Sequence, residues 1–231
     1  MFAELEKVMA SSLESDNFLE SIRNNVTGKR SKSGVEHTSR YLLQLYKFNM
    51  ADASFMAFTY FWKITDATER PLLAFVYAVY HDDLLAECLP VMQQTKTGEK
   101  AAVKLFEELV DKNHPNQYSP NTKKSMAQNL ASSWKQAGFI EGKIKNIRVQ
   151  PKINYQVACF AFLLAYLKGD RGDFIWSSIG VKALLLTETQ LRELAGECAK
   201  RDMMQYHYAG SVTAIGFNKL LNKIGIDVIK N

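Results

Sequence analysis

The feature that most constrains the fold is a polar helix pattern followed by a hairpin pattern in residues 119–151, SPNTKKSMAQNLASSWKQAGFIEGKIKNIRVQP. Ser119 is a favourable N-cap residue, and Pro120 suits the first position of a helix. Apolar side chains then recur at the spacing of one helix face: Met126, Leu130, Trp134 and Ala137. Because Gly138 favours the left-handed conformation that ends a helix, we expect the helix to stop there.

A short hairpin is expected directly after this helix. Phe139-Ile140 and the apolar residues Ile144, Ile147 and Val149 indicate two strands about a Glu141-Gly142 turn. Upstream, a further helix is expected to begin at Thr97 and to end at His114-Pro115. Helix, helix and hairpin is the order of a winged helix-turn-helix, in which the helix before the hairpin enters the major groove. An ordinary amphipathic helix and hairpin, or a winged helix that binds a protein, would show the same pattern.

Positive charge is concentrated in this same part of the chain. The 231 residues carry a net charge of +5. Residues 120–152 hold seven basic residues and one acidic residue, Glu141, so the segment has a net charge of +6 and the rest of the chain −1. A concentrated basic patch attracts polyanions and releases their counterions. The charge pattern therefore favours a nucleic acid as the partner.

The candidate nucleic-acid-binding residues come from the helix and the hairpin. The helix offers polar side chains off its apolar stripe: Lys123, Lys124, Gln128, Ser132 and Lys135. The hairpin and its flank offer cations that we expect to project outward: Lys143, Lys145, Arg148 and Lys152. Most of these would contact phosphates of double-stranded DNA, so binding is expected to depend steeply on salt and weakly on sequence. Lys29, Arg30 and Lys32 could add a second phosphate contact.

The fold class expected from the whole chain is mainly α, with three units. Residues 1–97 are expected to form a helical bundle that buries the aromatic run Phe55–Trp62, interrupted by a flexible basic loop at Gly28–Gly34. Residues 98–152 are the basic winged helix. Residues 153–231 repeat the order helix, helix, hairpin, with strands at Met203–Tyr208 and Val212–Phe217, and so are expected to form a second winged-helix-like unit without the basic surplus.

Catalytic chemistry finds little support in the sequence. The four histidines are far apart in sequence, so no metal site, cofactor or catalytic residue is predicted. Glu141-Gly-Lys143 matches the E-x-K triplet of metal-dependent nucleases, but its nearest upstream carboxylate, Asp111, is expected on a helix. A nuclease therefore remains the less favoured alternative. An adaptor subunit that binds protein or RNA partners in a larger complex is the other one.

The setting expected for the chain is the cytoplasm. Its three cysteines are odd in number and widely spaced, which is not a disulfide framework. The N-terminal residues lack the apolar stretch of a signal peptide. The longest apolar run, Val157–Leu167, has 11 residues, and a membrane span needs about 20. No membrane association is therefore expected.

The segment SPNTKKSMAQNLASSWKQAGFI resembles part of the small A protein of bacterial BREX phage-defence systems. The likeness rests on a Ser-Pro-x-Thr helix start and on Ala-Gly followed by two apolar residues, here Ser119, Pro120, Thr122, Ala137, Gly138, Phe139 and Ile140. The apolar helix Leu72–Met92 is also similar, and the likeness covers residues 35–152. The C-terminal third extends beyond that family's pattern. The resemblance implies a mostly helical DNA-binding protein without catalytic activity that works beside larger proteins of the defence system.

Overall fold

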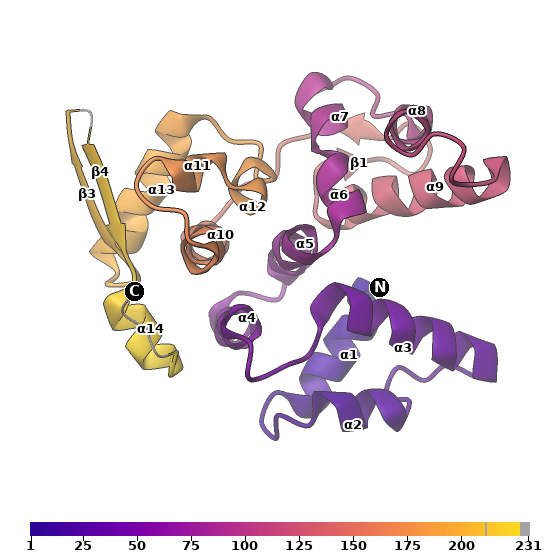
Figure 1. The fold of residues 1–231 in the computed structure, drawn as a ribbon, viewed down its shortest axis with the longest axis horizontal. Coiled ribbons are helices and arrows are strands. Elements are labelled where there is room, and N and C mark those ends of the chain that lie inside the picture. Colours follow the sequence, from indigo (N-terminus) through magenta and orange to yellow (C-terminus); the bar gives the residue numbers. More distant parts are fainter. Residues whose placement is uncertain (211, 227–231) are drawn as a thin grey trace.

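The computed structural model describes residues 1–210 and 212–226. It is mainly helical with two small antiparallel hairpins, which confirms the predicted fold class at that level (Figure 1). In chain order the elements are α1 (Phe2–Ser12), α2 (Phe18–Arg23), α3 (Lys32–Tyr46), α4 (Ala53–Ile64), α5 (Arg70–His81), α6 (Asp83–Glu87), α7 (Leu89–Gln94), α8 (Val103–Asn113), α9 (Pro120–Gln136), β1 (Ile140–Glu141), β2 (Ile147–Arg148), α10 (Tyr155–Lys168), α11 (Phe174–Ser177), α12 (Ile179–Lys182), α13 (Glu188–Lys200), β3 (Gln205–Ala209), β4 (Val212–Gly216) and α14 (Asn218–Ile224).

Three helices, α4, α5 and α10, form the centre of the molecule. Figure 1 shows α1–α3 and α6–α9 on one side of them and α11–β4 on the other. Phe58 of α4 stacks on Tyr77 of α5 with ring centroids 4.5 Å apart, and Phe160 of α10 lies 5.9 Å from Phe58. Phe55 and Phe58 are fully buried. The prediction that the aromatic run of α4 belongs to the core is therefore confirmed.

The basic loop before α3 has a defined structure. The side chain of Asn25 accepts from the Lys29 N–H (3.1 Å) and donates to the Lys29 carbonyl (2.8 Å). Ser31 then caps α3 by accepting from the Gly34 N–H, so α3 begins inside the predicted loop, at Lys32. The helix start at Lys32 brings the basic residues of this loop next to the exposed face of α3.

The segment after α5 is broken where the sequence places capping residues. Asp82 ends α5 and accepts from the Leu85 N–H (2.8 Å), which starts α6. Pro90 stands in the first turn of α7. The apolar helix expected over Leu72–Met92 is therefore divided among three helices.

The helix expected from Thr97 begins later, at Val103. Gly98 takes a φ of +90°, and its N–H donates to the Arg148 carbonyl (2.8 Å). The Arg148 N–H in turn donates to the Glu99 carbonyl (2.8 Å). Residues 98–101 are thus not helical, because hydrogen bonds to a distant strand outweigh their local helical pattern.

The C-terminal part contains the second predicted hairpin. β3 and β4 pair antiparallel from Gln205 opposite Gly216 to Ala209 opposite Val212. Thr187 caps α13 through a capping box with Gln190, as expected for its first turn. α14, which follows the hairpin, was not predicted. Ser211 of the predicted turn and residues 227–231 of the predicted unit lie outside the described residues.

Buried apolar residues form one continuous cluster through all three predicted units. α10 packs against both α4 and α5, which joins the C-terminal part to the N-terminal one. α9 also packs against α5. The core therefore holds α9 and the hairpin that follows it in a fixed relation to the rest of the molecule.

Candidate nucleic-acid interface

Helices α8 and α9 form a tightly packed pair joined by the turn at His114-Pro115. Phe106 and Val110 of α8 are buried, as are Leu130 and Trp134 of α9. The Ser119 hydroxyl accepts from the Thr122 N–H (3.3 Å) at the start of α9. Gly138 follows the helix with a φ of +86°. The N-cap, the buried stripe and the helix end predicted for α9 are confirmed.

Trp134 fixes the orientation of α9. Its ring centroid lies 4.6 Å from that of Phe75 on α5 and 5.2 Å from that of Phe139 at the base of the hairpin. Trp134 is fully buried. Because one side chain packs against α5 and against the hairpin, the opposite face of α9 is held outward at a fixed angle to β1 and β2.

The hairpin β1–β2 is present, with Ile140 opposite Arg148 and Glu141 opposite Ile147. Residues 98–101 run antiparallel along the other edge of β2. A bridge between Lys100 and Ile147 and a bond from the Ala101 N–H to the Asn146 carbonyl (2.8 Å) hold them there. β2 therefore lies between β1 and the segment that precedes α8.

The hairpin tip, residues 142–146, carries two exposed cations. Lys143 and Lys145 are exposed, and Ile144 between them is 85% exposed. The ammonium of Lys135 donates to the Gly142 carbonyl and to Asn146 Oδ1 (3.3 Å). Lys135 therefore ties the last turn of α9 to the hairpin tip, and its ammonium is occupied by these two neutral acceptors.

The exposed face of α9 is polar and free of carboxylates. Lys124, Gln128 and Ser132 lie one helical turn apart, and all three are exposed. α9 contains no Asp or Glu along its whole length. Next to this row the structure exposes three polar residues that sequence reasoning missed: Asn121, Ser125 and Asn129. Their own spacing of four residues was the signal that would have found them.

Lys123 points back toward α8. Its ammonium forms an ion pair with Asp111 near the end of that helix, and 16% of its side chain is exposed. The pair joins the two helices at the end away from the hairpin. Lys123 is thus a less available phosphate contact than Lys124, although the two are adjacent in sequence.

The expectation that Arg148 projects from the hairpin is wrong. Arg148 is 4% exposed, and its guanidinium lies 5.3 Å from the ring centroid of Phe139. It donates to the Val149 carbonyl and to Gln150 Oε1 (3.0 Å), and burial lowers its pKa. Since residues directly opposite each other in an antiparallel pair share a face, Arg148 lies on the same face as its buried partner Ile140. It is a structural residue of the hairpin base.

Lys152 lies beyond the hairpin, in the segment that leads to α10. It is exposed, and its charge acts on Glu69 at the start of α5. Burial raises the pKa of Glu69, and the positive charge of Lys152 opposes that rise. The charge of Lys152 therefore acts on a carboxylate that belongs neither to α9 nor to the hairpin.

Of the nine predicted residues, five are exposed on α9 and the hairpin tip and form no ion pair with the described residues: Lys124, Gln128, Ser132, Lys143 and Lys145. We call these five residues the α9–hairpin surface. Glu141 is the exposed carboxylate nearest to them in sequence. Long cationic and amide side chains of this kind donate hydrogen bonds to phosphate oxygens and to base edges.

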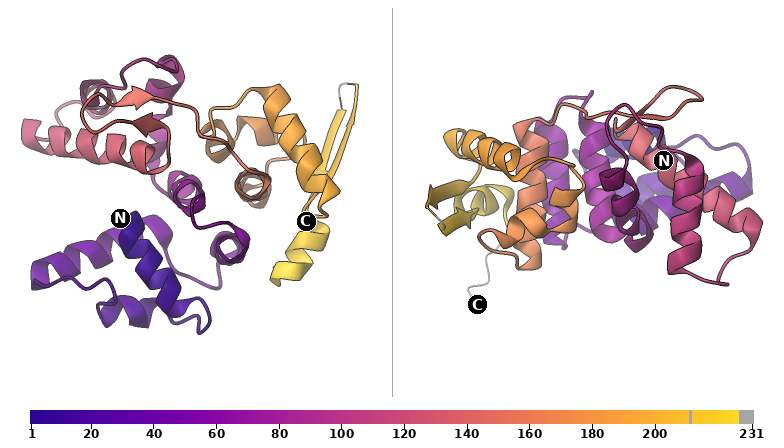
Figure 2. Two further views of the ribbon diagram at one scale, coloured as in Figure 1. Left: turned by 180° about the vertical axis from the view of Figure 1, so that it is seen from behind. Right: turned by 90° about the horizontal axis from the view of Figure 1, so that it is seen from above.

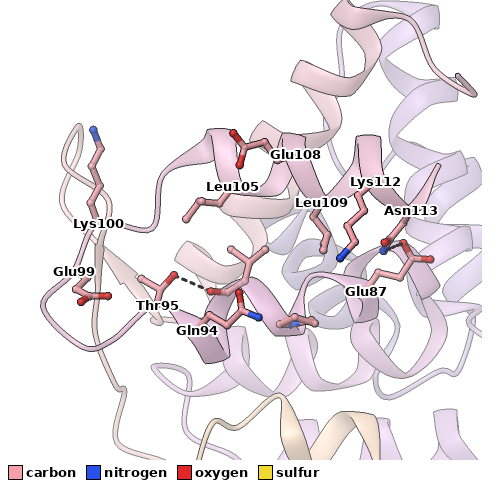
Figure 3. Close-up of a pocket in the computed structure, with 12 residues that line it drawn as sticks. Glu87, Gln94, Thr95, Glu99, Lys100, Leu105, Glu108, Leu109, Lys112 and Asn113 are labelled. Atoms are coloured by element: carbon pink, nitrogen blue, oxygen red, sulfur yellow. Dashed lines mark hydrogen bonds between the residues drawn. The ribbon is translucent and has the colours of Figure 1, made fainter. Parts of the chain in front are cut away.

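A groove of about 600 Å³ between α7 and α8 has a different character (Figure 3). Val91, Leu105 and Leu109 contribute apolar surface to it, and Glu87 on its wall accepts from the side chain of Asn113 (3.1 Å). Carboxylates and ammonium groups both line it: Glu87, Glu99, Glu108, Lys100 and Lys112. Because these charges are mixed, the groove offers a polyanion no uniform attraction.

Comparisons of this chain with protein-family models, with curated proteins and with solved structures gave no match. Within residues 1–210 and 212–226, no group of three or more His, Cys, Asp and Glu side chains is arranged to hold a metal ion. In the same residues, every helix is too short or too polar to cross a membrane.

Proposed function

We propose that this protein binds double-stranded DNA through residues 98–148, which act as a winged helix-turn-helix. α9 serves as the recognition helix and the β1–β2 hairpin as the wing. The observation that carries the proposal is the α9–hairpin surface: an exposed helix face without carboxylates beside two exposed lysines at a hairpin tip. A single antiparallel bridge between Lys100 and Ile147, at the place where a winged helix has its third strand, supports the proposal.

In this proposal the lysines and the neutral polar residues have separate tasks. Lys124, Lys143 and Lys145 contact phosphates, because their charges are exposed and unpaired. Gln128 and Ser132 project from the middle of α9, where a recognition helix reaches base edges. With few neutral polar groups and several cations, binding depends more on charge than on sequence.

Three other cations hold this surface in position. Lys135 holds the hairpin tip against α9, and Lys123 holds α9 against α8. Arg148 fills the hairpin base beside Phe139. Their substitution would disturb the position of the surface more than its charge.

The proposed setting is a bacterial phage-defence system in which this non-enzymatic protein works beside larger proteins. The support is the resemblance to the small A protein of BREX systems. Its shared positions include Ser119 and Gly138, which cap the two ends of α9. The likeness therefore concerns residues that shape the proposed recognition helix.

An adaptor that binds a protein partner is the second candidate. It is favoured by Ile144, which stands 85% exposed at the hairpin tip between two lysines. An exposed branched aliphatic side chain at a protruding tip is suited to an apolar pocket on another protein. Phosphate binding alone gives this side chain no role.

Fluorescence anisotropy with labelled duplex DNA, single-stranded DNA and RNA distinguishes the two functions. The proposal predicts binding to the duplex at moderate salt, lost in the triple variant Lys124→Glu, Lys143→Glu, Lys145→Glu. A matched triple variant at exposed lysines on other elements, Lys63→Glu, Lys182→Glu and Lys200→Glu, should keep its affinity. An adaptor predicts no binding to any of the three nucleic acids. Cleavage of the DNA with Mg²⁺ or Mn²⁺ that Glu141→Ala abolishes would contradict the non-enzymatic assignment.

A further inference from the structure

The N-terminal helices carry their charge unevenly. Residues 1–28, with α1 and α2, hold five acidic and two basic side chains, a net charge of −3. Residues 29–47, with α3, hold five basic side chains and one acidic side chain, a net charge of +4. This second basic region does not show in the net charge of the chain outside residues 120–152, because the acidic residues in 1–28 offset most of it.

The basic residues of α3 share its exposed face. Ser33, His37, Arg40 and Gln44 follow one another along α3 at intervals of three or four residues, and Lys47 follows directly after the helix end; all five are exposed. The opposite face, with Thr38, Leu42 and Tyr46, is buried. Glu36 is the one carboxylate of α3. The exposed face therefore offers cations and neutral hydrogen-bond donors, as that of α9 does, but it also carries the exposed Glu36 one turn before Arg40.

Arg40 is positioned on this face by two neighbouring side chains. Its guanidinium donates to His37 Nδ1 (3.2 Å) and lies 5.1 Å from the ring centroid of Tyr41. Neither contact neutralises its charge. Arg30 and Lys32 at the start of the helix are also exposed, whereas Lys29 is paired with Glu4 at 2.7 Å.

α3 and α9 lie at the same end of the molecule. Figures 1 and 2 show the two helices on either side of the N-terminus, both directed away from α5. The Phe2 N–H at the start of α1 donates to Gln136 Oε1 at the end of α9 (3.4 Å), and α1 also packs against α3. A ligand held by α9 is thus close to the unit that carries α3.

We infer that the exposed face of α3, with Arg40 and Lys47 as its principal cations, makes a second phosphate contact on the duplex that α9 binds. The duplex is the ligand that this face fits best, because the cations and hydrogen-bond donors of α3 complement phosphates. Glu36 is the one carboxylate of α3 that would repel them. This inference rests on the proposed function. It adds a contact region outside the winged helix, in a unit that the hydrogen bond between Phe2 and Gln136 connects to α9.

The test is the salt dependence of duplex affinity for Arg40→Gln, Lys47→Gln. Each phosphate contact contributes about 0.9 to the slope of log K against log salt, so two lost contacts lower the slope by about 1.8 and the affinity at 0.1 M salt on the order of 60-fold. Lys63→Gln, Lys200→Gln removes the same charge from exposed positions on α4 and α13 and should leave the slope unchanged. The melting temperature of each variant confirms that it is folded.

The possible results distinguish a failure of this inference from a failure of the proposed function. A normal slope for Arg40→Gln, Lys47→Gln, with lost binding in the α9–hairpin variant, overturns the inference and keeps the function. No duplex binding by the wild-type protein overturns both. A stoichiometry of two duplexes per chain that falls to one in Arg40→Gln, Lys47→Gln would also contradict it, because α3 and α9 would then hold separate molecules.

Discussion

The ammonium of Lys135 donates to the Gly142 carbonyl, and this contact ties the last turn of α9 to the tip of the β1–β2 hairpin. Helix and hairpin contribute to one surface only if their relative position is fixed. Trp134 fixes it on the buried side, through Phe75 and Phe139, and Lys135 fixes it on the solvent side.

Lys135→Met should loosen the hairpin tip without unfolding the protein. We expect faster amide hydrogen exchange at residues 142–146, because the Gly142 carbonyl and Asn146 lose their common partner. Lys124→Met, which removes the same charge from an unpaired position on α9, should leave that exchange unchanged. Equal exchange in both variants would show that the Lys135 contact does not hold the tip.

Trp134→Ala should destabilise the protein by about 3–5 kcal/mol, because it empties the volume of a fully buried aromatic side chain. Trp134→Phe should cost much less. The indole Nε1 has no hydrogen-bond partner in the described structure, so a phenyl ring loses no bond. Denaturant unfolding of the two variants measures the difference. Similar losses would contradict the packing role assigned to the ring.

Arg148→Ala should lower the free energy of unfolding by about 1.5–3 kcal/mol, the usual range for hydrogen bonds made by a charged group. The change also removes the packing of the guanidinium on Phe139. At a temperature where the variant is folded, its salt slope for duplex DNA should equal that of the wild type. A lower slope would mean that Arg148 does contact phosphate.

Trp134 and Arg148 show which parts of the site could be predicted from the sequence and which could not. The cap at Ser119, the buried stripe ending at Trp134 and the helix end at Gly138 follow from local rules, and the structure confirms them. The orientation of Arg148 depends on strand register. A hairpin with strands of two residues has too little alternation to reveal its register, so an arginine opposite a buried isoleucine was assigned to the wrong face.

Long-range pairing explains the other differences. Residues 98–101 have a helical sequence pattern, but hydrogen bonds to β2 keep them out of a helix. The ion pair of Lys123 with Asp111 joins α9 to α8, and the packing angle of the two helices cannot be predicted from the sequence of either helix alone. The charge balance of residues 120–152 could be counted from the sequence. Which of those charges remain free depends on tertiary contacts.

Acid should weaken the attachment of α1 to the loop before α3. The hydrogen bond and charge of Lys29 lower the pKa of Glu4 from 4.5 to about 2. Since the folded pKa lies below the unfolded one, this stabilisation is complete above pH 4.5 and is lost as the pH falls toward 2. NMR titration of the Glu4 carboxylate should give a pKa nearer 4.5 in Lys29→Met. An unchanged value would contradict the pairing.

The salt dependence of duplex affinity tests the central claim most directly. Neutralising three cations of the α9–hairpin surface, in Lys124→Gln, Lys143→Gln, Lys145→Gln, should lower the slope of log K against log salt by about 2.7, at about 0.9 per phosphate contact. The same count of neutral substitutions at Lys63, Lys182 and Lys200 should leave the slope as it is in the wild type. An equal slope for the wild type and the α9–hairpin variant would contradict the account, because these lysines would then not contact the duplex.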